Sequence, residues 1–510
     1  MSGEVKDECG IAAVSLKREQ DKSLFYIYKM LLNLQNRGQL AAGFTVYNNQ
    51  KAQLLETHRG LGVVNEVFKT HNKLKSSLMF KRYVGSKAIG HVRYATFGLD
   101  NLEYAQPFER KHGRLWKWFS FCFNGNLTNF SELKSKLMAK PEYHMIYDTD
   151  TEIIMHYTAR ELIGSSKPSL KRVFHNLSNK FDGAYNIAFL DAHGDLVVSR
   201  DPYGFRPLSY SIKDGDLLAA SESNALFNCG FRDIKSLEPG KMICSQNGNI
   251  IVKRYAKAKK RSHCMFEWVY FANVSSVIDG KSVYITRTNL GKELAKLETE
   301  DISKDHIIVP VPDTAKAAGD ALAYELGIPS MEGLIRNRFV GRTFIEGSGR
   351  ERKVENKYTV IRPILKDRKV ILVDDSLVRG LTSQALVSYL KEVGGAREVH
   401  LRVSCPPIKA PCFYGIDMST VTELLAPKFE KPIDPEKTTE KTCEKIANFL
   451  GADSVIYQTI TGLVKSIDLP RRDLCLACLT GKYPTTCGKA LYCKALKESN
   501  IKNYKRTYES

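Results

Sequence analysis

Several hallmarks of other protein classes are missing from this sequence. No apolar run approaches the roughly 20 residues that a membrane span needs. The first ten residues, MSGEVKDECG, lack the apolar segment of a secretory signal. There is also no internal repeat and no low-complexity tract. We therefore expect a globular protein of the cytoplasm that has no membrane partner.

The chain has fewer acidic than basic side chains. It contains 56 Asp and Glu and 76 Lys and Arg, which gives a formal net charge of +20. Such an excess attracts polyanions, among them nucleic acids and phosphorylated metabolites. The densest basic run, Lys257–Arg261, has no interleaved aromatic residues and no nucleic-acid-binding motif beside it. We interpret this run as a solvated linker, and we expect phosphate-rich substrates and no nucleic acid as partners.

The chain is too long for one ordinary core, because single cores stop growing near 250–300 residues. Up to about residue 250, short alternating runs end in Gly, Asn and Asp turns, and helical patterns interrupt them at Phe25–Gln35 and Thr151–Gly164. This rhythm predicts an α+β first half. From about Ser303, continuous apolar strands alternate with helices, which predicts a parallel sheet covered on both faces. The boundary between the halves is expected near 250–285.

The stretch VILVDDSLVRGLTS (Val370–Ser383) runs an apolar strand into two adjacent carboxylates, Asp374 and Asp375. In open α/β sheets, ligands bind beyond the carboxyl ends of the strands. The loop that follows can offer backbone N–H groups and hydroxyls at a helix N-terminus, which favours a phosphate. The acids would then take ribose hydroxyls or Mg²⁺. The alternative interpretation is a surface turn with solvated acids.

This loop resembles the signature of phosphoribosyltransferases, and Val309–Asp313 resembles the strand of their pyrophosphate loop. The stretch RNRFVGRTFI (Arg336–Ile345) more narrowly resembles the amidophosphoribosyltransferase family. The resemblance implies Mg²⁺ at Asp374 and Asp375 and binding of phosphoribosyl pyrophosphate. It assigns substrate contacts to Arg379, Gly380, Thr382 and Ser383. The basic residues Arg350, Arg352, Lys353 and Lys357 would suit a flap over pyrophosphate, although composition alone fits a mobile charged loop equally well.

Cys9 stands directly before an apolar run, close to the N-terminus but not at it. As an interior residue it would be an ordinary thiol. If the first eight residues are removed, Cys9 gains an α-amine, which titrates near pH 8 and can accept the thiol proton at neutral pH. A catalytic role for Cys9 therefore requires removal of a propeptide, residues 1–8.

Five segments resemble, in order and spacing, the glutamine amidotransferase domain of the N-terminal-nucleophile class. They are CGI at Cys9, LQNRGQLAAG (34–43), GHVRYATFG (90–98), FNGNLTN (123–129) and DTDTE (148–152). The resemblance implies that Cys9 attacks the glutamine amide. It also implies that Asn124 and the Gly125 N–H stabilise the oxyanion, that Arg93 pairs with the substrate carboxylate and that Asp150 holds the substrate ammonium.

Twelve cysteines in a chain expected in the cytoplasm argue for metal binding or catalysis rather than disulfides. Near the C-terminus, Cys475, Cys478, Cys487 and Cys493 suggest a zinc site, but the spacing of the second pair does not fit common zinc modules. The resemblance offers another set, four ligands of a [4Fe–4S] cluster. These are Cys264, Cys412, Cys475 and Cys478, and the two remaining tail cysteines would then be spectators.

The sequence departs from the family pattern at several positions. Ala315 follows Thr314 where the family has a metal-binding Ser, and Leu381 replaces the first Thr of the phosphate loop. Asn36 and Leu40 stand where the family favours His and an acid, and Phe123 replaces a His. These changes put the affinity for metal and for phosphoribosyl pyrophosphate in doubt more than the reaction itself.

The resemblance implies an αββα N-terminal-nucleophile hydrolase domain followed by an α/β phosphoribosyltransferase domain with a parallel sheet. We expect a propeptide at 1–8, the amidotransferase domain at 9–250, a linker at 251–285, the transferase domain at 286–470 and a cysteine-containing tail at 471–510. The implied reaction is transfer of ammonia from glutamine to phosphoribosyl pyrophosphate, which gives 5-phosphoribosylamine, glutamate and pyrophosphate in the first committed step of purine synthesis.

The resemblance further implies a homotetramer that purine nucleotides inhibit. Two alternatives stay open. One is another amidotransferase of the same class, although those enzymes lack the VDDSLVRG loop. The other is a catalytically impaired paralogue that binds phosphoribosyl pyrophosphate or nucleotides as a regulator, with Ala315 and Leu381 as signs of decay.

Overall fold

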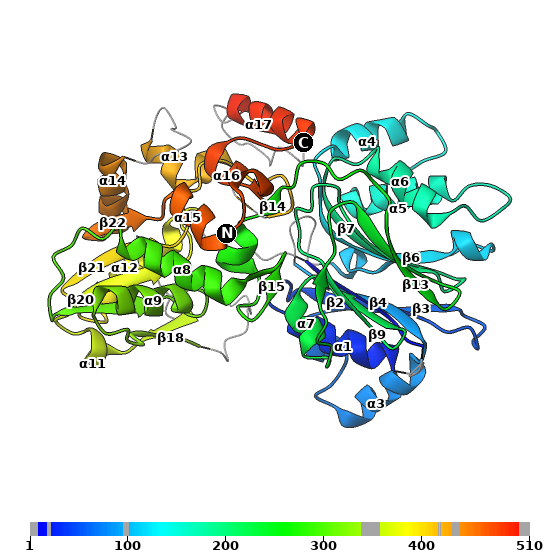
Figure 1. Ribbon diagram of the computed structural model, residues 1–510, viewed down its shortest axis with the longest axis horizontal. Coiled ribbons are helices and arrows are strands. Elements are labelled where there is room, and N and C mark those ends of the chain that lie inside the picture. Colours follow the sequence, from blue (N-terminus) through cyan, green and yellow to red (C-terminus); the bar gives the residue numbers. More distant parts are fainter. Residues whose placement is uncertain are drawn as a thin grey trace.

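The computed structural model describes residues 9–17, 22–94, 101–337, 357–416, 418, 420–430 and 439–498. Two halves lie side by side in it (Figure 1). The first half is built from two antiparallel sheets, and the second contains a parallel sheet. Among the described residues, no helix combines the length and apolar character that crossing a bilayer demands.

The first half contains a seven-stranded and a six-stranded sheet. The first, in spatial order, comprises β11 (Lys235–Ser236), β9 (Ser209–Lys213), β10 (Asp216–Ala220), β1 (Gly10–Ser15), β4 (Lys87–Arg93), β2 (Ala41–Tyr47) and β3 (Leu55–Leu61). The second comprises β13 (Asn249–Arg254), β12 (Lys241–Gln246), β8 (Leu196–Arg200), β7 (Gly183–Asp191), β6 (Phe119–Leu127) and β5 (Phe108–Arg110). The central strand β1 is buried along its whole length, because one face packs on helices and the other on the second sheet.

Helices cover the outer face of each sheet. The first set comprises α1 (Ser23–Asn33), α2 (Val64–Val67), α3 (Lys73–Arg82) and α7 (Ser223–Phe227). The second comprises α4 (Phe130–Met138), α5 (Asp150–Glu161) and α6 (Leu170–Ser178). Three separate apolar cores lie between the four layers. The expected αββα architecture is confirmed, and both predicted helices are present, as α1 and α5.

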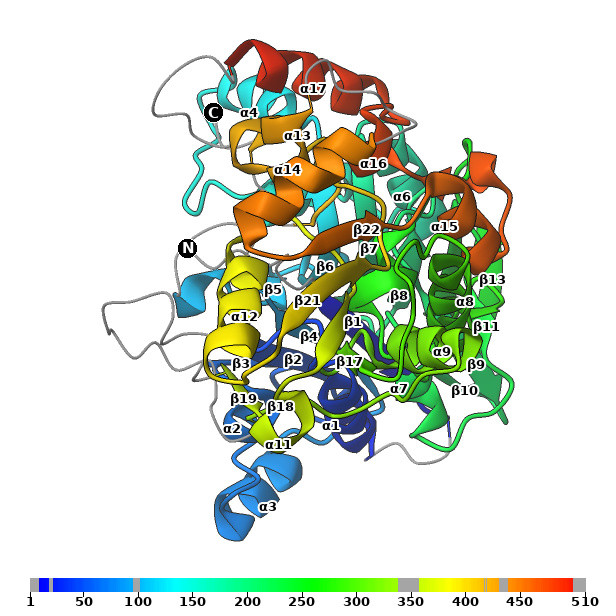
Figure 2. The same ribbon diagram turned by 90° about the vertical axis from the view of Figure 1, so that its left-hand side faces the viewer.

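The second half is organised around a four-stranded parallel sheet, ordered β17 (His306–Pro310), β20 (Lys369–Asp374), β21 (Glu398–Val403) and β22 (Ser454–Tyr457). One face carries α8 (Val283–Ala295), α9 (Lys316–Leu326) and α15 (Ile460–Ile467), and the other carries α12 (Leu381–Glu392) and α14 (Glu440–Leu450) (Figure 2). The smaller elements are β18 (Leu334–Arg336), β19 (Tyr358–Val360), α11 (Arg362–Leu365), η4 (Val421–Glu423) and α13 (Leu425–Phe429). The predicted parallel sheet is therefore confirmed.

Between the halves, the chain forms β14 (His263–Cys264), a π-helix η3 (Glu267–Phe271), β15 (Val277–Ile278) and β16 (Lys281–Ser282). The tail forms η5 (Arg471–Asp473), β23 (Leu474–Cys475), α16 (Ala477–Thr480) and α17 (Thr486–Glu498). Strands β14 and β23 pair in parallel, so the tail is fastened to the segment between the halves. The Cys487 N–H donates to Asp182 at 3.4 Å, which also ties the tail to the first half.

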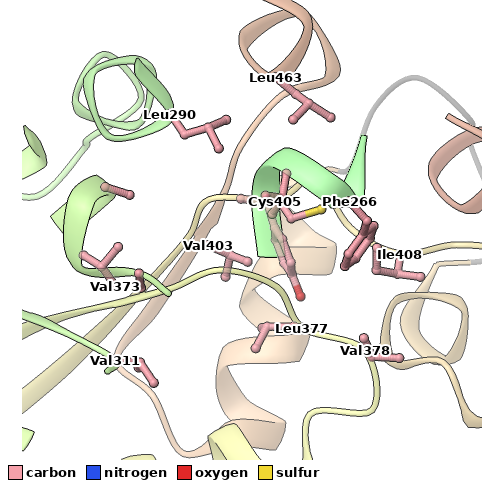
Figure 3. Packing of buried hydrophobic residues seen from close by; sticks show 14 of the residues in the cluster. Phe266, Leu290, Val311, Val373, Leu377, Val378, Val403, Cys405, Ile408 and Leu463 are labelled. Atoms are coloured by element: carbon pink, nitrogen blue, oxygen red, sulfur yellow. The ribbon is translucent and has the colours of Figure 1, made fainter. Parts of the chain in front are cut away.

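One continuous core joins the parallel sheet to the segment between the halves. Phe266, directly before η3, lies close to Ile408 and Cys405, beyond the carboxyl end of β21 (Figure 3). All three side chains are at most 1% exposed. Because this packing leaves little space for rearrangement, it fixes η3 against the edge of the sheet where ligands bind in open α/β folds.

Candidate active sites

Cys9 immediately precedes β1, whose neighbours in the sheet are β4 and β10. It lines a pocket together with Arg93, Gly125 and Asp150, four of the five residues that the sequence predicts for a glutaminase. Cys9 Sγ lies 3.8 Å from the Tyr94 carbonyl oxygen. Burial raises the pKa of the Cys9 thiol. A buried thiol of this kind needs a base close by to become a nucleophile.

Asn124 and Gly125 lie on β6, a strand of the second sheet, and Gly125 lines this pocket whereas Asn124 does not. Asn124 is 2% exposed, and its Nδ2 donates a long hydrogen bond of 3.4 Å to Ser221 Oγ. The same hydroxyl accepts from the Ile11 N–H at 3.0 Å, so Asn124 is tied to the strand that follows Cys9. Gly125 has φ +146°, and a Cβ there would stand 1.9 Å from the Ala184 carbonyl oxygen. Only glycine fits this position.

Arg93 and Asp150 supply opposite charges to the same pocket. Arg93 ends β4, and its guanidinium lies 5.4 Å from the centre of the Tyr104 ring. Asp150 begins α5, where free backbone N–H groups accommodate a carboxylate. Burial raises the pKa of Asp150 to about 6, and N–H donors that include those of Leu127 and Thr151 oppose that rise. A guanidinium and a carboxylate that line one pocket suit the carboxylate and ammonium of an amino acid.

A buried ion network is centred on Arg37, and sequence reasoning missed it. Arg37 donates to Glu222 at 2.6 Å through Nε and to Glu267 at 2.6 Å through Nη2, and all three side chains are at most 1% exposed. Because Glu267 belongs to η3, the network joins the first half to the segment between the halves. Arg37 lies in the segment LQNRGQLAAG (34–43), but nothing in the sequence indicates its distant partners.

Asp374 and Asp375 lie where β20 ends, at the carboxyl edge of the parallel sheet. Asp375 is 7% exposed and accepts hydrogen bonds from the hydroxyls of Thr314 and Ser376. Thr314, from the loop after β17, thus directs its hydroxyl at the acidic pair, whereas the adjacent Ala315 is buried at the start of α9. The strand that resembles the pyrophosphate loop of the family therefore ends beside the two acids.

The loop after the acids leads into the N-terminus of α12, and Thr382 and Ser383 lie in the first turn of that helix. Gly380 has φ +77°, and a Cβ there would stand 2.8 Å from Leu425 Cδ2. The loop can therefore turn sharply and present backbone N–H groups to an anion. Arg379 Nη2 lies 3.2 Å from Glu423 Oε2, which orients the guanidinium.

The narrow family motif at 336–345 begins at Arg336, which pairs with Asp313 at 3.2 Å. Its remaining residues from 338 onwards, together with Arg350, Arg352 and Lys353, lie outside the described residues. Lys357 is described and lies over the Tyr358 ring, 5.0 Å from its centre.

The four predicted cluster cysteines belong to one buried neighbourhood. Cys264 and Cys475 are paired across β14 and β23. The Tyr414 N–H donates to Cys412 Sγ at 3.3 Å, and Cys478 lies on α16. Burial raises the pKa of the Cys264 thiol to about 12, and the nearby Cys412 adds to that rise. Among the described residues, however, no group of three or more His, Cys, Asp or Glu side chains is arranged to hold a metal ion.

The fold and the two sites together define a class of protein: a glutamine amidotransferase joined to a phosphoribosyltransferase. A family model for the glutamine amidotransferase domain matches residues 76–233. The amidophosphoribosyltransferase of Methanothermobacter thermautotrophicus is 37% identical, over 94% of this chain and 95% of that protein. The Bacillus subtilis amidophosphoribosyltransferase is 36% identical, over 95% and 96%. The chain belongs to the amidophosphoribosyltransferase family.

Solved structures agree with this assignment. The glutamine phosphoribosylpyrophosphate amidotransferase of B. subtilis, complexed with ADP and GMP, superposes with a TM-score of 0.80 at 35% identity, over 94% of this chain and 98% of that one. A structure of the allosteric regulatory enzyme of purine biosynthesis gives a TM-score of 0.81 at 35% identity, over 94% and 96%. The chain is thus an enzyme of this family, as predicted, and nothing in these comparisons favours the purely regulatory alternative.

Proposed function

We propose that Cys9 is the nucleophile of the glutaminase reaction and attacks the amide carbon of glutamine to form a thioester. Arg93 would hold the substrate carboxylate and Asp150 its ammonium. The Asn124 side chain and the Gly125 N–H would stabilise the oxyanion that develops on the amide oxygen. The observation that carries this proposal is the single pocket that Cys9 shares with Arg93, Gly125 and Asp150.

The thiol proton needs an acceptor, because burial raises the pKa of Cys9. We propose that the α-amine of Cys9 accepts it once residues 1–8 have been removed. These residues lie outside the described part of the chain. N-terminal sequencing of active protein should therefore find Cys9 first, and an intact Met1 on fully active protein would contradict the proposal.

In the second half, ammonia would attack C1 of phosphoribosyl pyrophosphate, and pyrophosphate would leave with inversion. Arg379, Gly380, Thr382 and Ser383 would hold the 5′-phosphate at the N-terminus of α12. The paired acids suit a hard cation, with the Thr314 hydroxyl beside them. Asp374 and Asp375 would hold Mg²⁺, which when bound offsets the charge of the leaving pyrophosphate. Keeping ammonia inside the protein prevents its protonation in water.

We further propose that Cys264, Cys412, Cys475 and Cys478 ligate a [4Fe–4S] cluster. A single zinc ion would draw four sulfurs to within about 3.8 Å of one another, given Zn–S bonds near 2.3 Å. A cubane binds one thiolate at each of four irons and spans a wider neighbourhood. This suits the four thiols, of which Cys412, Cys475 and Cys478 belong to one core cluster and Cys264 packs against it, with no single-ion site among the described residues. Such a cluster would be structural and would fasten the tail to the segment between the halves.

Metal analysis of anaerobically purified protein should find about four iron atoms per chain, as one cubane requires. Stoichiometric zinc would overturn the assignment. Cys487 and Cys493 serve as controls, because substituting either one should leave the iron content unchanged.

The relative complexed with ADP and GMP supports purine nucleotides as inhibitors of this chain, and we propose a homotetramer as its assembly. The coupled assay tests the whole proposal. Protein incubated with glutamine, Mg²⁺ and phosphoribosyl pyrophosphate should release glutamate and pyrophosphate in equal amounts. Release of glutamate alone would show that the chain acts only as a glutaminase. Release of neither product would favour the regulator.

A further inference from the structure

A loop from the second half of the chain lies directly against the strand that carries the proposed oxyanion donors. Asn126 Nδ2, on β6, donates a 3.0 Å hydrogen bond to the Phe413 carbonyl oxygen. A Cβ on Gly415 would stand 3.1 Å from the carbonyl carbon of Gly125 and 3.2 Å from its oxygen. The two backbones are therefore in contact, although almost 300 residues separate them in the sequence.

This loop is held from its other side by the first half. Arg206, which is 1% exposed, donates from Nη2 to the Tyr414 carbonyl oxygen. The Tyr414 ring stacks on Phe205 with ring centres 4.2 Å apart and planes inclined by 18°. Both Phe413 and Tyr414 are at most 3% exposed. Because a buried guanidinium and a stacked ring anchor this loop, we expect its backbone to move little relative to β6.

Gly125 lies between this loop and strand β7. On the β7 side, the Ala184 carbonyl oxygen occupies the space that a Gly125 Cβ would need. On the other side, Gly415 approaches so closely that its own Cβ would press on the Gly125 backbone and on Arg206. The Gly125 Cα is thus confined on the β7 side and its carbonyl group on the Gly415 side. The N–H of a residue is joined to its own carbonyl group through one Cα and two backbone torsions, so this confinement restricts where the Gly125 N–H points.

We propose that the Phe413–Gly415 loop sets the geometry of the glutaminase oxyanion hole, with Asn126 and Gly415 as positioning residues. The inference rests on the proposed roles of Cys9, Asn124 and Gly125. Under it, the glutaminase half does not complete its own active site, because one wall of the oxyanion hole comes from the second half of the chain.

The proposal predicts a specific kinetic signature. Oxyanion donors act on the charge that develops in the transition state and contribute little to ground-state binding. A loosened hole should therefore lower kcat for glutamine hydrolysis and leave KM for glutamine unchanged. Synthesis from added ammonia bypasses the glutaminase and should not change.

The first variant is Asn126→Ala, which removes the hydrogen bond to Phe413 and retains both donors. We expect kcat for glutamine hydrolysis to fall about tenfold, less than the 10²–10³-fold loss on deleting a donor. Asn48→Ala is the matched control, because Asn48 is also half-buried and donates to a backbone carbonyl, that of Val84, at 2.9 Å, remote from the pocket. The control should leave both activities unchanged.

The second variant, Gly415→Ala, pushes a methyl group against the Gly125 backbone and should give the same signature. A rise in KM at constant kcat for Asn126→Ala would overturn the proposal, since Asn126 would then contact glutamine itself. A parallel loss of glutamine- and ammonia-dependent synthesis would assign the loop a purely structural role. Unchanged kcat would also overturn it. A different result would overturn the proposed function itself: if Cys9→Ala still hydrolysed glutamine, Cys9 would not be the nucleophile, whatever the loop variants do.

Discussion

The two candidate sites are assembled in opposite ways. The glutaminase pocket draws Cys9, Arg93, Gly125 and Asp150 from four elements spread over more than 140 residues. The sugar-phosphate site takes Asp374 to Ser383 from one continuous strand, loop and helix. The first site therefore depends on how two sheets stack, whereas the second depends mainly on local backbone geometry and on where one strand ends.

This difference has a consequence for mutation. In the dispersed site each donor is held by its own set of neighbours, so a single substitution should affect one step and leave the other half of the enzyme active. In the contiguous site, neighbouring side chains share one loop and one helix terminus. Assays with glutamine and with ammonia separate the two sites, because only the first assay requires the glutaminase.

The largest effect should come from Cys9→Ala, which deletes the proposed nucleophile. Loss of a nucleophile costs on the order of 10⁴-fold or more in kcat. Glutamate release should disappear, whereas ammonia-dependent formation of 5-phosphoribosylamine should continue at the rate of the parent protein. The same variant should retain residues 1–8 in N-terminal sequencing. Loss of the ammonia-dependent reaction would show that the two sites are not separable.

Asn124→Ala should rank second, with kcat for glutamine hydrolysis reduced roughly 10²–10³-fold, as on removal of one oxyanion donor. Its KM for glutamine should change little, because the lost hydrogen bond acts on the transition state. Steady-state glutamate release measures both values. A large rise in KM would move Asn124 from oxyanion stabilisation to glutamine binding.

The contiguous site could be predicted from the sequence more directly than the dispersed glutaminase site. The strand, acids and loop at Val370–Ser383 can be identified from their order alone, because the motif is contiguous and its chemistry is local. Taken alone, the stretch around Asn124 fits a turn as well as an active site, and Arg93 fits a surface charge as well as a substrate contact. Their interpretation therefore depends on the ordered resemblance to a family.

Other features were out of reach of any local pattern. The Arg37 network and the contact of Gly415 with Gly125 depend on tertiary packing between the halves. The Thr314 hydroxyl lies on Asp375 because two neighbouring parallel strands end at the same edge. Such partners are set by strand order and by the segment between the halves, neither of which hydrophobic periodicity encodes.

Asp375→Asn tests the contiguous site. It removes a buried charge that we place at the Mg²⁺ site, and contacts to charged groups contribute roughly 1.5–3 kcal/mol each. We therefore expect synthesis from glutamine and from ammonia to fall together, by about 10–150-fold. Glutamine hydrolysis measured without phosphoribosyl pyrophosphate should stay at the parent rate. Loss of that basal hydrolysis as well would contradict the separation of the sites.

The pH dependence of glutamine use should report Asp150. Burial raises its pKa to about 6, so above that pH the carboxylate is charged and can hold the substrate ammonium. Below it, the neutral acid binds weakly, and KM for glutamine should rise about tenfold between pH 7 and pH 5. The proposed α-amine base of Cys9, which titrates near pH 8, should lower kcat over the same range and leave KM unchanged. In Asp150→Asn the rise in KM at low pH should vanish, and KM should be high at every pH. An unchanged rise in KM would assign the titration to another group.

The smallest effect should come from Leu381→Thr, which repairs a departure from the family at the first residue of α12. The half-buried Leu381 side chain offers no hydrogen bond to a phosphate at the helix N-terminus, whereas a threonine hydroxyl would donate one. A typical hydrogen bond contributes about 0.5–1.5 kcal/mol, so KM for phosphoribosyl pyrophosphate should fall about 2–12-fold.

Leu381→Val, which is β-branched but lacks the hydroxyl, is the matched control and should leave KM unchanged. If both variants lowered KM equally, side-chain size rather than the hydroxyl would limit binding. Glutamine hydrolysis measured without the sugar phosphate should change in neither variant. The pair therefore tests the loop separately from the glutaminase pocket, with a smaller disturbance than a substitution of either acid would cause.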